Sequence, residues 1–156
     1  MKKAVISLFA ILAGTSIAMA GNAGCDAFKW PVTREQALFP AAPPAQSGAD
    51  LTVGQAMDFA LVAVDAISFE VPPQHAPAAG TFGATASGEL QFSLSDEAWI
   101  DVVQDGHAVK STGFSGVKTC PGIRKSVRFK LSAGPATVQF SGAKKADLKV
   151  AVLTPE

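Results

Sequence analysis

Two histidines, His75 and His107, are the side chains of this 156-residue chain best suited to metal binding or proton transfer. A mononuclear iron site of the two-histidine, one-carboxylate type would require both of them. His75 lies in a stretch rich in proline and alanine, and His107 follows Asp105-Gly106, a dipeptide typical of tight turns. Both positions indicate solvent-exposed loops, so we predict that neither histidine is a metal ligand and that the chain holds no cofactor.

Four acidic residues that lie close together form a second candidate metal site: Asp96, Glu97, Asp101 and Asp105. Carboxylate oxygens are the ligands that Ca²⁺ prefers, and extracellular modules often bind this ion. The spacing of these residues matches no known calcium loop. We therefore predict that the carboxylates form a hydrated surface rather than a calcium site.

A candidate ligand face combines Trp99 with Arg124 and Arg128. The two arginines and Lys130 alternate along residues 124–130, which places them on one side of a predicted strand. Arginine can hold an anionic group through paired hydrogen bonds. The same stripe is also the ordinary polar side of an antiparallel strand, where charges discourage pairing with other chains. The polar-strand interpretation is favoured, and the ligand face stays as the alternative.

The aromatic composition argues against a sugar-binding protein. Trp30 and Trp99 are the two tryptophans of a chain that has ten phenylalanines and no tyrosine. Sandwich proteins that bind sugars stack them on several exposed aromatic rings. Phenylalanine is typical of the core, so we expect most of these rings to be buried.

No recognised catalytic motif is present in the sequence. It has no glycine-rich phosphate loop, no Gly-x-Ser-x-Gly nucleophile turn and no paired-cysteine zinc motif. A serine-based triad would need one of the two histidines, and both lie in predicted loops. We therefore expect a protein that is not an enzyme.

The first twenty residues have the pattern of an export signal. Lys2 and Lys3 are followed by an uncharged apolar run over residues 4–17 and by Ala18-Met19-Ala20, which has small residues at the two positions that signal peptidase requires. This order matches a signal peptide with its cleavage site near Ala20, and the apolar run is too short for a persuasive membrane span. The sequence therefore predicts a periplasmic or secreted protein.

Export changes what the two cysteines, Cys25 and Cys120, are expected to do. In an oxidising compartment, two cysteines in one small domain predict a disulfide. Attachment of a lipid at Cys25 is the main alternative, because Ala23-Gly24 precedes it, although Asn22 stands where such signals carry Leu or Val. A cysteine nucleophile is a third alternative, but no histidine lies near Cys120 in the sequence.

Charge excludes two classes of partner. Without Lys2 and Lys3, 11 basic residues stand against 13 acidic ones, which leaves a net charge of about −2 and no basic cluster. Such a surface does not favour nucleic acid or an anionic membrane. Residues 51–71 are interrupted by Asp58, Asp65 and Glu70, so we expect no transmembrane segment after the signal peptide. The expected partner is an envelope protein or a small ligand, whose identity the sequence does not indicate.

The chain divides into a short N-terminal part and a longer strand-rich part. Thr33 and Gln36 resemble a weak capping box for a helix over residues 34–39 that ends at Pro40. Residues 41–48 are rich in proline and alanine and predict a linker. We therefore expect residues 21–48 to form a helical segment with its linker, and residues 49–156 to form a β domain. Over residues 55–64, a helix competes with a strand because short apolar runs do not settle the period.

Alternation of apolar and polar residues predicts strands through the second half of the chain. The clearest examples span residues 80–85, 89–95, 98–104, 125–131, 137–141 and 148–153. In the segment over 125–131, Lys125 shares a face with Val127, Phe129 and Leu131. Residues 114–122 are glycine-rich and predict an irregular segment. Strands at spacings of about 8–12 residues with little helix are typical of an antiparallel β-sandwich or barrel.

Residues 80–153 also resemble a known type of exported domain. The resemblance is carried by Trp99-Ile100-Asp101-Val102, the Asp105-Gly106 turn, the run Cys120-Pro121-Gly122-Ile123-Arg124-Lys125-Ser126-Val127-Arg128-Phe129, Leu131 and Gly134. This order is similar to the pre-peptidase C-terminal type of domain, a non-catalytic appendage of secreted hydrolases. The resemblance implies a jelly-roll-like β-sandwich without catalytic residues.

A second resemblance points to an enzyme. The segment over residues 25–31, Cys-Asp-Ala-Phe-Lys-Trp-Pro, resembles the start of short exported proteins labelled homogentisate dioxygenase. Enzymes of that kind hold iron with two histidines and a glutamate on a cupin-like barrel, which would assign His75 and His107 to the metal. Neither histidine lies in a cupin motif.

Together these observations predict an exported, non-catalytic β-sandwich protein that acts as a binding or structural module of the periplasm or envelope. The alternative is a metal-dependent dioxygenase, which is implied by resemblance only.

Overall fold

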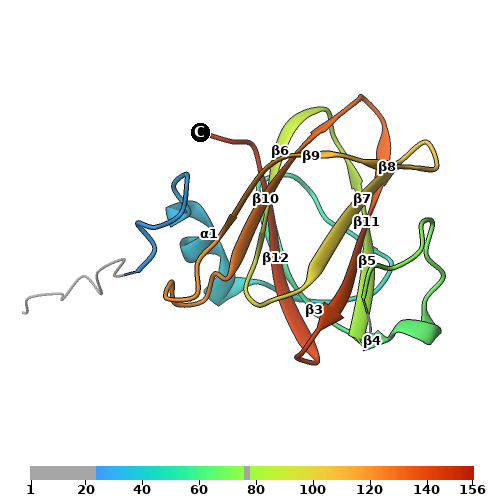
Figure 1. Ribbon diagram of the computed structural model, residues 1–156, viewed down its shortest axis with the longest axis horizontal. Coiled ribbons are helices and arrows are strands. Elements are labelled where there is room, and N and C mark those ends of the chain that lie inside the picture. Colours follow the sequence, from blue (N-terminus) through green and yellow to red (C-terminus); the bar gives the residue numbers. More distant parts are fainter. Residues whose placement is uncertain (1–23, 76–77) are drawn as a thin grey trace, which may run out of the picture.

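The alternating segments of the sequence form two β-sheets that pack face to face in the computed structural model (Figure 1). The structure describes residues 24–75 and 78–156, so the predicted signal peptide over residues 1–20 lies outside the described residues. The predicted fold class, a mostly β sandwich with a short N-terminal helix, is confirmed.

The first sheet contains six strands in the spatial order β1-β3-β12-β6-β10-β9. Their bounds are Pro44–Gln46 (β1), Gln55–Ala60 (β3), Asp147–Leu153 (β12), Gly88–Leu94 (β6), Lys125–Leu131 (β10) and Ser111–Gly116 (β9). The second sheet has the order β2-β5-β11-β7-β8, and β4 pairs with β5 beside this path. Their bounds are Ala49–Asp50 (β2), Ala78–Thr85 (β5), Pro135–Ala143 (β11), Trp99–Gln104 (β7), His107–Val109 (β8) and Val62–Ala63 (β4).

The chain winds between the sheets as a jelly roll does. It alternates from β3 in the first sheet to β5 in the second, then to β6 and back to β7, and again from β10 to β11 to β12. Several neighbouring strands are therefore distant in sequence, as when β12 lies between β3 and β6. The β7–β8 connection is the expected tight hairpin, because Asp105 and Gly106 both have positive φ values, 52° and 75°.

Two parallel pairs make the sheets mixed rather than purely antiparallel. Strand β1 runs parallel to β3, and β2 runs parallel to β5. Part of the predicted linker over residues 41–48 is therefore built into the first sheet, since β1 occupies Pro44–Gln46. Proline is tolerated there because β1 is an edge strand, where a missing N–H breaks no ladder.

Because side chains alternate between the two faces of a strand, the apolar positions of each strand determine which residues form the core. Phe59 on β3 is fully buried and stacks on Phe82 of β5, with ring centroids 5.2 Å apart. Phe92 and Phe140 join the same cluster between the sheets. The strand, not the competing helix, therefore forms over residues 55–60, because Phe59 faces the core while Asp58 faces outward to Lys149.

Two local predictions were wrong. Thr33 does not cap helix α1 (Thr33–Leu38); it is the first helical residue, and Val32 holds the cap position without a side-chain hydrogen bond. A 3₁₀ helix, η1 (Phe39–Ala41), continues through Pro40, which sits at its start where the missing N–H costs nothing.

The second error concerns residues 114–122, whose first part is strand β9 rather than irregular chain. Gly113 has a packing role in β9, because its missing side chain lets the Trp30 ring lie close to the strand. A Cβ on Gly113 would lie 3.3 Å from the Trp30 ring.

The N-terminal segment covers the outer face of the first sheet (Figure 1, α1 in blue). Its apolar side chains pack with sheet residues in a second cluster: Cys25, Phe28, Val32, Phe39, Ala56, Val117, Cys120, Ile123 and Ala151. Cys25 and Cys120 form a disulfide within it, which confirms the predicted pairing. The segment is therefore part of the same folded unit as the sandwich.

The outer face of the second sheet has a lighter cover. The chain after the short helix η2 (Val64–Ala66) crosses it, and the buried amide of Gln139 accepts hydrogen bonds from the backbone N–H groups of Glu70 and Val71. Gln139 also donates to the carbonyl of Val71. Among the described residues, no helix has the length and apolar character needed to cross a membrane.

Candidate functional site: a pocket at the edge of the sandwich

A pocket of about 420 Å³ opens between the two sheets at the edge formed by β7, β9 and β10; we call it the edge pocket. Its innermost wall is apolar and buried, and consists of Ile100, Val127 and Phe129. A volume of this size lies within the range of small-molecule sites, which are mostly apolar with a few polar groups.

The pocket exists because the second sheet is incomplete at this edge. Within the described chain, β8 pairs only with Val102–Gln104 of β7, so Trp99–Asp101 have no strand neighbour on that side. Strand β9 is the last strand of the first sheet, and its Phe114 lies directly opposite Val127 of β10. The side of the first sheet that faces the core is therefore left partly uncovered.

Two aromatic rings stand at the mouth of the edge pocket. Trp99 is 42 % exposed and Phe114 is 51 % exposed, and these are the large hydrophobic side chains exposed in the described part of the chain. The indole N–H of Trp99 donates a hydrogen bond of 3.0 Å to Asp101, which holds the ring in place. Exposed apolar side chains scattered singly need no explanation, but two that share one pocket indicate a binding surface.

Lys125 lies between these rings. Its Nζ is 5.4 Å from the Trp99 ring centroid and 5.5 Å from that of Phe114, within the range of cation–π attraction. Nζ also donates a 2.8 Å hydrogen bond to the carbonyl of Ala98. Burial lowers the pKa of Lys125, an effect that Glu97 and Asp101 partly oppose and Arg124 reinforces.

The structure brings only one member of the predicted ligand face to this pocket. Trp99 lines it, whereas Arg124 lies before β10 and pairs with Glu97 at 3.7 Å. Arg128 points to the opposite side of β10, where its guanidinium lies 4.1 Å from the Trp30 ring centroid. Trp99, which belongs to β7 of the second sheet, and the Arg128 side chain therefore lie on opposite sides of β10.

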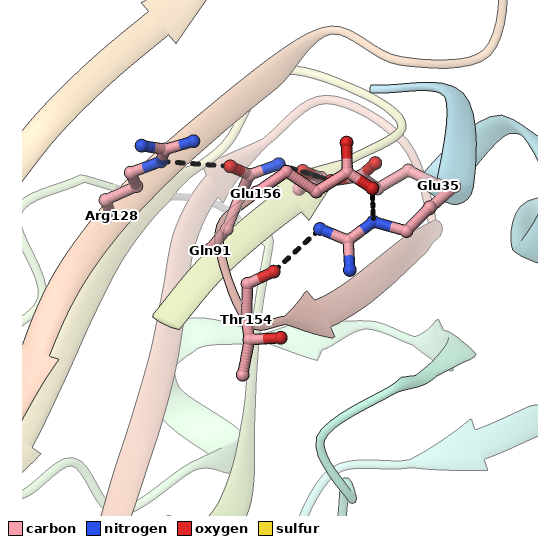
Figure 2. A network of polar contacts seen from close by, with 7 residues as sticks. Glu35, Gln91, Arg128, Thr154 and Glu156 are labelled. Atoms are coloured by element: carbon pink, nitrogen blue, oxygen red, sulfur yellow. Dashed lines mark hydrogen bonds and ion pairs between the residues drawn. The ribbon is translucent and has the colours of Figure 1, made fainter. Parts of the chain in front are cut away.

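Arg128 belongs to a buried polar network beneath the N-terminal segment. Its Nε donates to Gln91, which in turn donates to Glu35 of helix α1 at 2.6 Å (Figure 2). Ser93 donates to the same carboxylate oxygen at 2.9 Å. Glu35 is only 1 % exposed, so these contacts fasten the helix to the sheet. Arg34 extends the attachment to the C-terminal residues through Thr154 and Glu156.

The pocket residues that sequence reasoning missed are Phe114 and Lys125. Lys125 carried a usable signal, since it is the one charged residue on the apolar face of residues 125–131. Phe114 carried no such signal in the sequence, because its segment was predicted to be irregular. Its exposure also depends on β9 being the last strand of the first sheet.

The two histidines lie at opposite ends of β7. The His75 ring packs edge-on against Trp99 at 5.3 Å, whereas His107 pairs with Gln104 and approaches the carbonyl of Asp105. A strand rises about 3.3 Å per residue, so the two rings are separated by on the order of 15 Å. They are too distant to bind the same metal ion.

The acidic residues also occupy separate environments. Asp96 forms an ion pair with Lys145 at 2.6 Å, and Glu97 pairs with Arg124. Asp101 accepts the hydrogen bond from the indole N–H of Trp99. Burial raises the pKa of Asp96, but its hydrogen bonds with Lys145 and with the Glu97 backbone lower it by more. In the described ranges, no three His, Cys, Asp or Glu side chains gather in a metal-binding arrangement.

Comparisons of the chain with models of protein families, with curated proteins and with solved structures find no match.

Proposed function

We propose that this chain is an exported, non-catalytic binding protein of the periplasm or envelope, and that the edge pocket holds a small ligand. The observation that carries the proposal is the meeting of Trp99 and Phe114, both exposed, at one pocket whose inner wall is apolar. Exposed aromatic rings around an apolar cavity favour ligands that bury a flat or apolar surface.

The polar groups of the edge pocket support binding rather than catalysis. Its titratable side chains are Asp101 and Lys125; Asp101 accepts a hydrogen bond from Trp99, and Lys125 uses one of its three donors on the carbonyl of Ala98. Ser111 lines the pocket without a histidine among the lining residues. Within the described residues no hydrogen bond joins Ser111 to Lys125 or Asp101, whose bonds go to Ala98 and Trp99, so no activated nucleophile is assembled there.

Export is supported by two independent features. Residues 1–20 have the signal-peptide pattern, and Cys25 and Cys120 form a disulfide, which persists in oxidising compartments. The resemblance of residues 80–153 to the pre-peptidase C-terminal type agrees with a non-catalytic role in this proposal. A dioxygenase with His75 and His107 as iron ligands is not favoured, because the two rings are on the order of 15 Å apart.

The binding proposal is tested by titration with N-phenyl-1-naphthylamine, an uncharged apolar probe. In a Trp30→Phe background, Trp99 is the one remaining tryptophan, so quenching of its emission by the bound probe reports the edge pocket. We expect one saturable site that Phe114→Ala weakens at least about ten-fold. Equal binding by both proteins, or no saturable binding, would contradict the proposal.

Export and maturation are tested by mass spectrometry of the protein purified from the periplasm, with metal analysis of the same sample. The proposal expects a chain that starts at Gly21 and is two mass units lighter than its reduced form. A lipid on Cys25 would place the protein on a membrane surface instead. Stoichiometric iron would restore the dioxygenase alternative.

A further inference from the structure

We infer that the edge pocket selects small amphipathic anions, which consist of a flat apolar body and one acidic group that pairs with Lys125. This inference rests on the proposed function and specifies its ligand class.

The distribution of polar groups orients such a ligand. The inner wall, formed by Ile100, Val127 and Phe129, offers no hydrogen-bonding side chain, so an apolar body is favoured there. Trp99 and Phe114 are more exposed and flank the entrance. Lys125, half-buried between the two rings, is the one cationic side chain that lines the pocket.

Lys125 has capacity left for an anion. An ammonium group carries three donors, and the described structure uses one of them on the carbonyl of Ala98. Within the described residues, no carboxylate lies within ion-pair distance of this ammonium, whereas Asp101 is bonded to Trp99. Burial already disfavours the charged form of Lys125 and lowers its pKa. An acidic group beside Nζ would compensate that charge.

Two other ligand classes fit less well. A cationic ligand would compete with Lys125, whose ammonium already occupies the space between Trp99 and Phe114. A sugar would place hydroxyl groups against Ile100, Val127 and Phe129, where they would lose their hydrogen bonds to water without replacement. An amphipathic anion avoids both costs; the one carboxylate that lines the pocket, Asp101, opposes its charge but accepts a hydrogen bond from Trp99.

The test compares two probes that differ by one sulfonate. N-phenyl-1-naphthylamine is uncharged, and 8-anilinonaphthalene-1-sulfonate has the same rings with the acidic group added. Each is titrated into the wild-type protein, Lys125→Met and Lys125→Arg. Methionine keeps the length of the lysine stem without its charge, and arginine keeps the charge.

We expect Lys125→Met to weaken binding of the sulfonate probe at least about ten-fold, and Lys125→Arg to change it less than about three-fold. The uncharged probe should still bind all three proteins saturably, which shows that the pocket is formed in Lys125→Met, and its affinity for each variant corrects for what the substitution changes besides charge. If the sulfonate probe binds wild type and Lys125→Met equally, the inference is wrong while the proposed function stands. If neither probe binds the wild type saturably, the proposed function is wrong.

Discussion

Strand β10 carries two cation–aromatic pairs on its opposite faces, and only one of them is open to a ligand. On the outer face, Arg128 lies over Trp30; on the face toward the core, Lys125 lies beside Trp99. In the first pair, Trp30 comes from the N-terminal segment and packs against the second hydrophobic cluster, whereas the second pair stands at the mouth of the edge pocket. The same contact type therefore serves attachment on one side and, in our proposal, recognition on the other.

The partners of each pair explain the difference. Trp30 donates its indole N–H to Ser126, and Arg128 donates to Gln91, so both polar groups are bonded inside the protein. Arginine suits this role because its planar, permanently charged group stacks and bonds at once. Lys125 keeps two donors beside the exposed rings of Trp99 and Phe114, at the edge pocket. A cation–aromatic contact thus indicates a binding site only when its rings are exposed beside a cavity.

Removing the disulfide would most strongly disrupt the covered side. Cys25 and Cys120 are 95 residues apart, and opening a loop of this length in the double variant Cys25→Ser with Cys120→Ser should lower the free energy of unfolding by about 4–5 kcal/mol. Urea denaturation measures the loss. At temperatures where the variant stays folded, probe binding at the edge pocket should be unchanged. A loss below about 1 kcal/mol would show that packing and the Glu35 network hold the segment alone.

Replacing each tryptophan with alanine in turn would show which cation–aromatic pair contributes to stability and which contributes to binding. Trp30→Ala removes packing in the second cluster, the bond to Ser126 and the stacking on Arg128, and should cost about 2–3 kcal/mol of stability. Trp99→Ala removes an exposed side chain and should cost less than about 1 kcal/mol.

Binding should follow the opposite order. Trp99→Ala should weaken binding of the uncharged probe at least about ten-fold, and Trp30→Ala should leave it within about three-fold. Binding is followed by the fluorescence of the probe itself, because Trp99→Ala removes the tryptophan reporter. Similar stability losses in the two variants, or similar losses of binding, would remove the distinction between the covered and the open pair.

A smaller effect, a change in the free energy of unfolding with pH, would show that Lys125, and not Arg128, loses its proton in this range. Because burial lowers its pKa in the folded protein below the ordinary value of 10.5, the unfolded chain binds more protons between these two values. The free energy of unfolding should therefore rise with pH in this window through Lys125, and its burial penalty disappears above the ordinary pKa.

Urea denaturation of wild type and Lys125→Met between about pH 8 and pH 10.5 measures this contribution. The rise should be smaller in Lys125→Met, whereas Arg128→Met should keep it. The same slope in wild type and Lys125→Met would show that Lys125 keeps an ordinary pKa in the fold.

Strong local alternation made much of the fold predictable. The strand predicted over 125–131 coincides with β10, and the one predicted over 89–95 is displaced by one residue from β6. The hairpin at Asp105-Gly106 and the disulfide were also predicted from residue types. The strands and the hairpin depend on residues that are neighbours in the sequence. The disulfide was predictable because the chain has only two cysteines, so only one pairing is possible.

Weaker segments took their structure from distant partners. Residues 44–46, which begin with a proline, form a strand because β3 lies beside them. Residues 111–116 form one because β10 offers a partner at the sheet edge. Glycine and proline carry little strand preference, so no local pattern indicated either element.

The sequence by itself determined the alternation that builds the sheets, the two cysteines available for one disulfide, and the side of β10 on which Lys125 and Arg128 each lie. Only the tertiary structure decided which tryptophan each cation meets and which pair is covered. The physical reason is range: the two sides of a strand follow from its own period, whereas exposure at a sheet edge depends on where β8 stops and where the N-terminal segment packs.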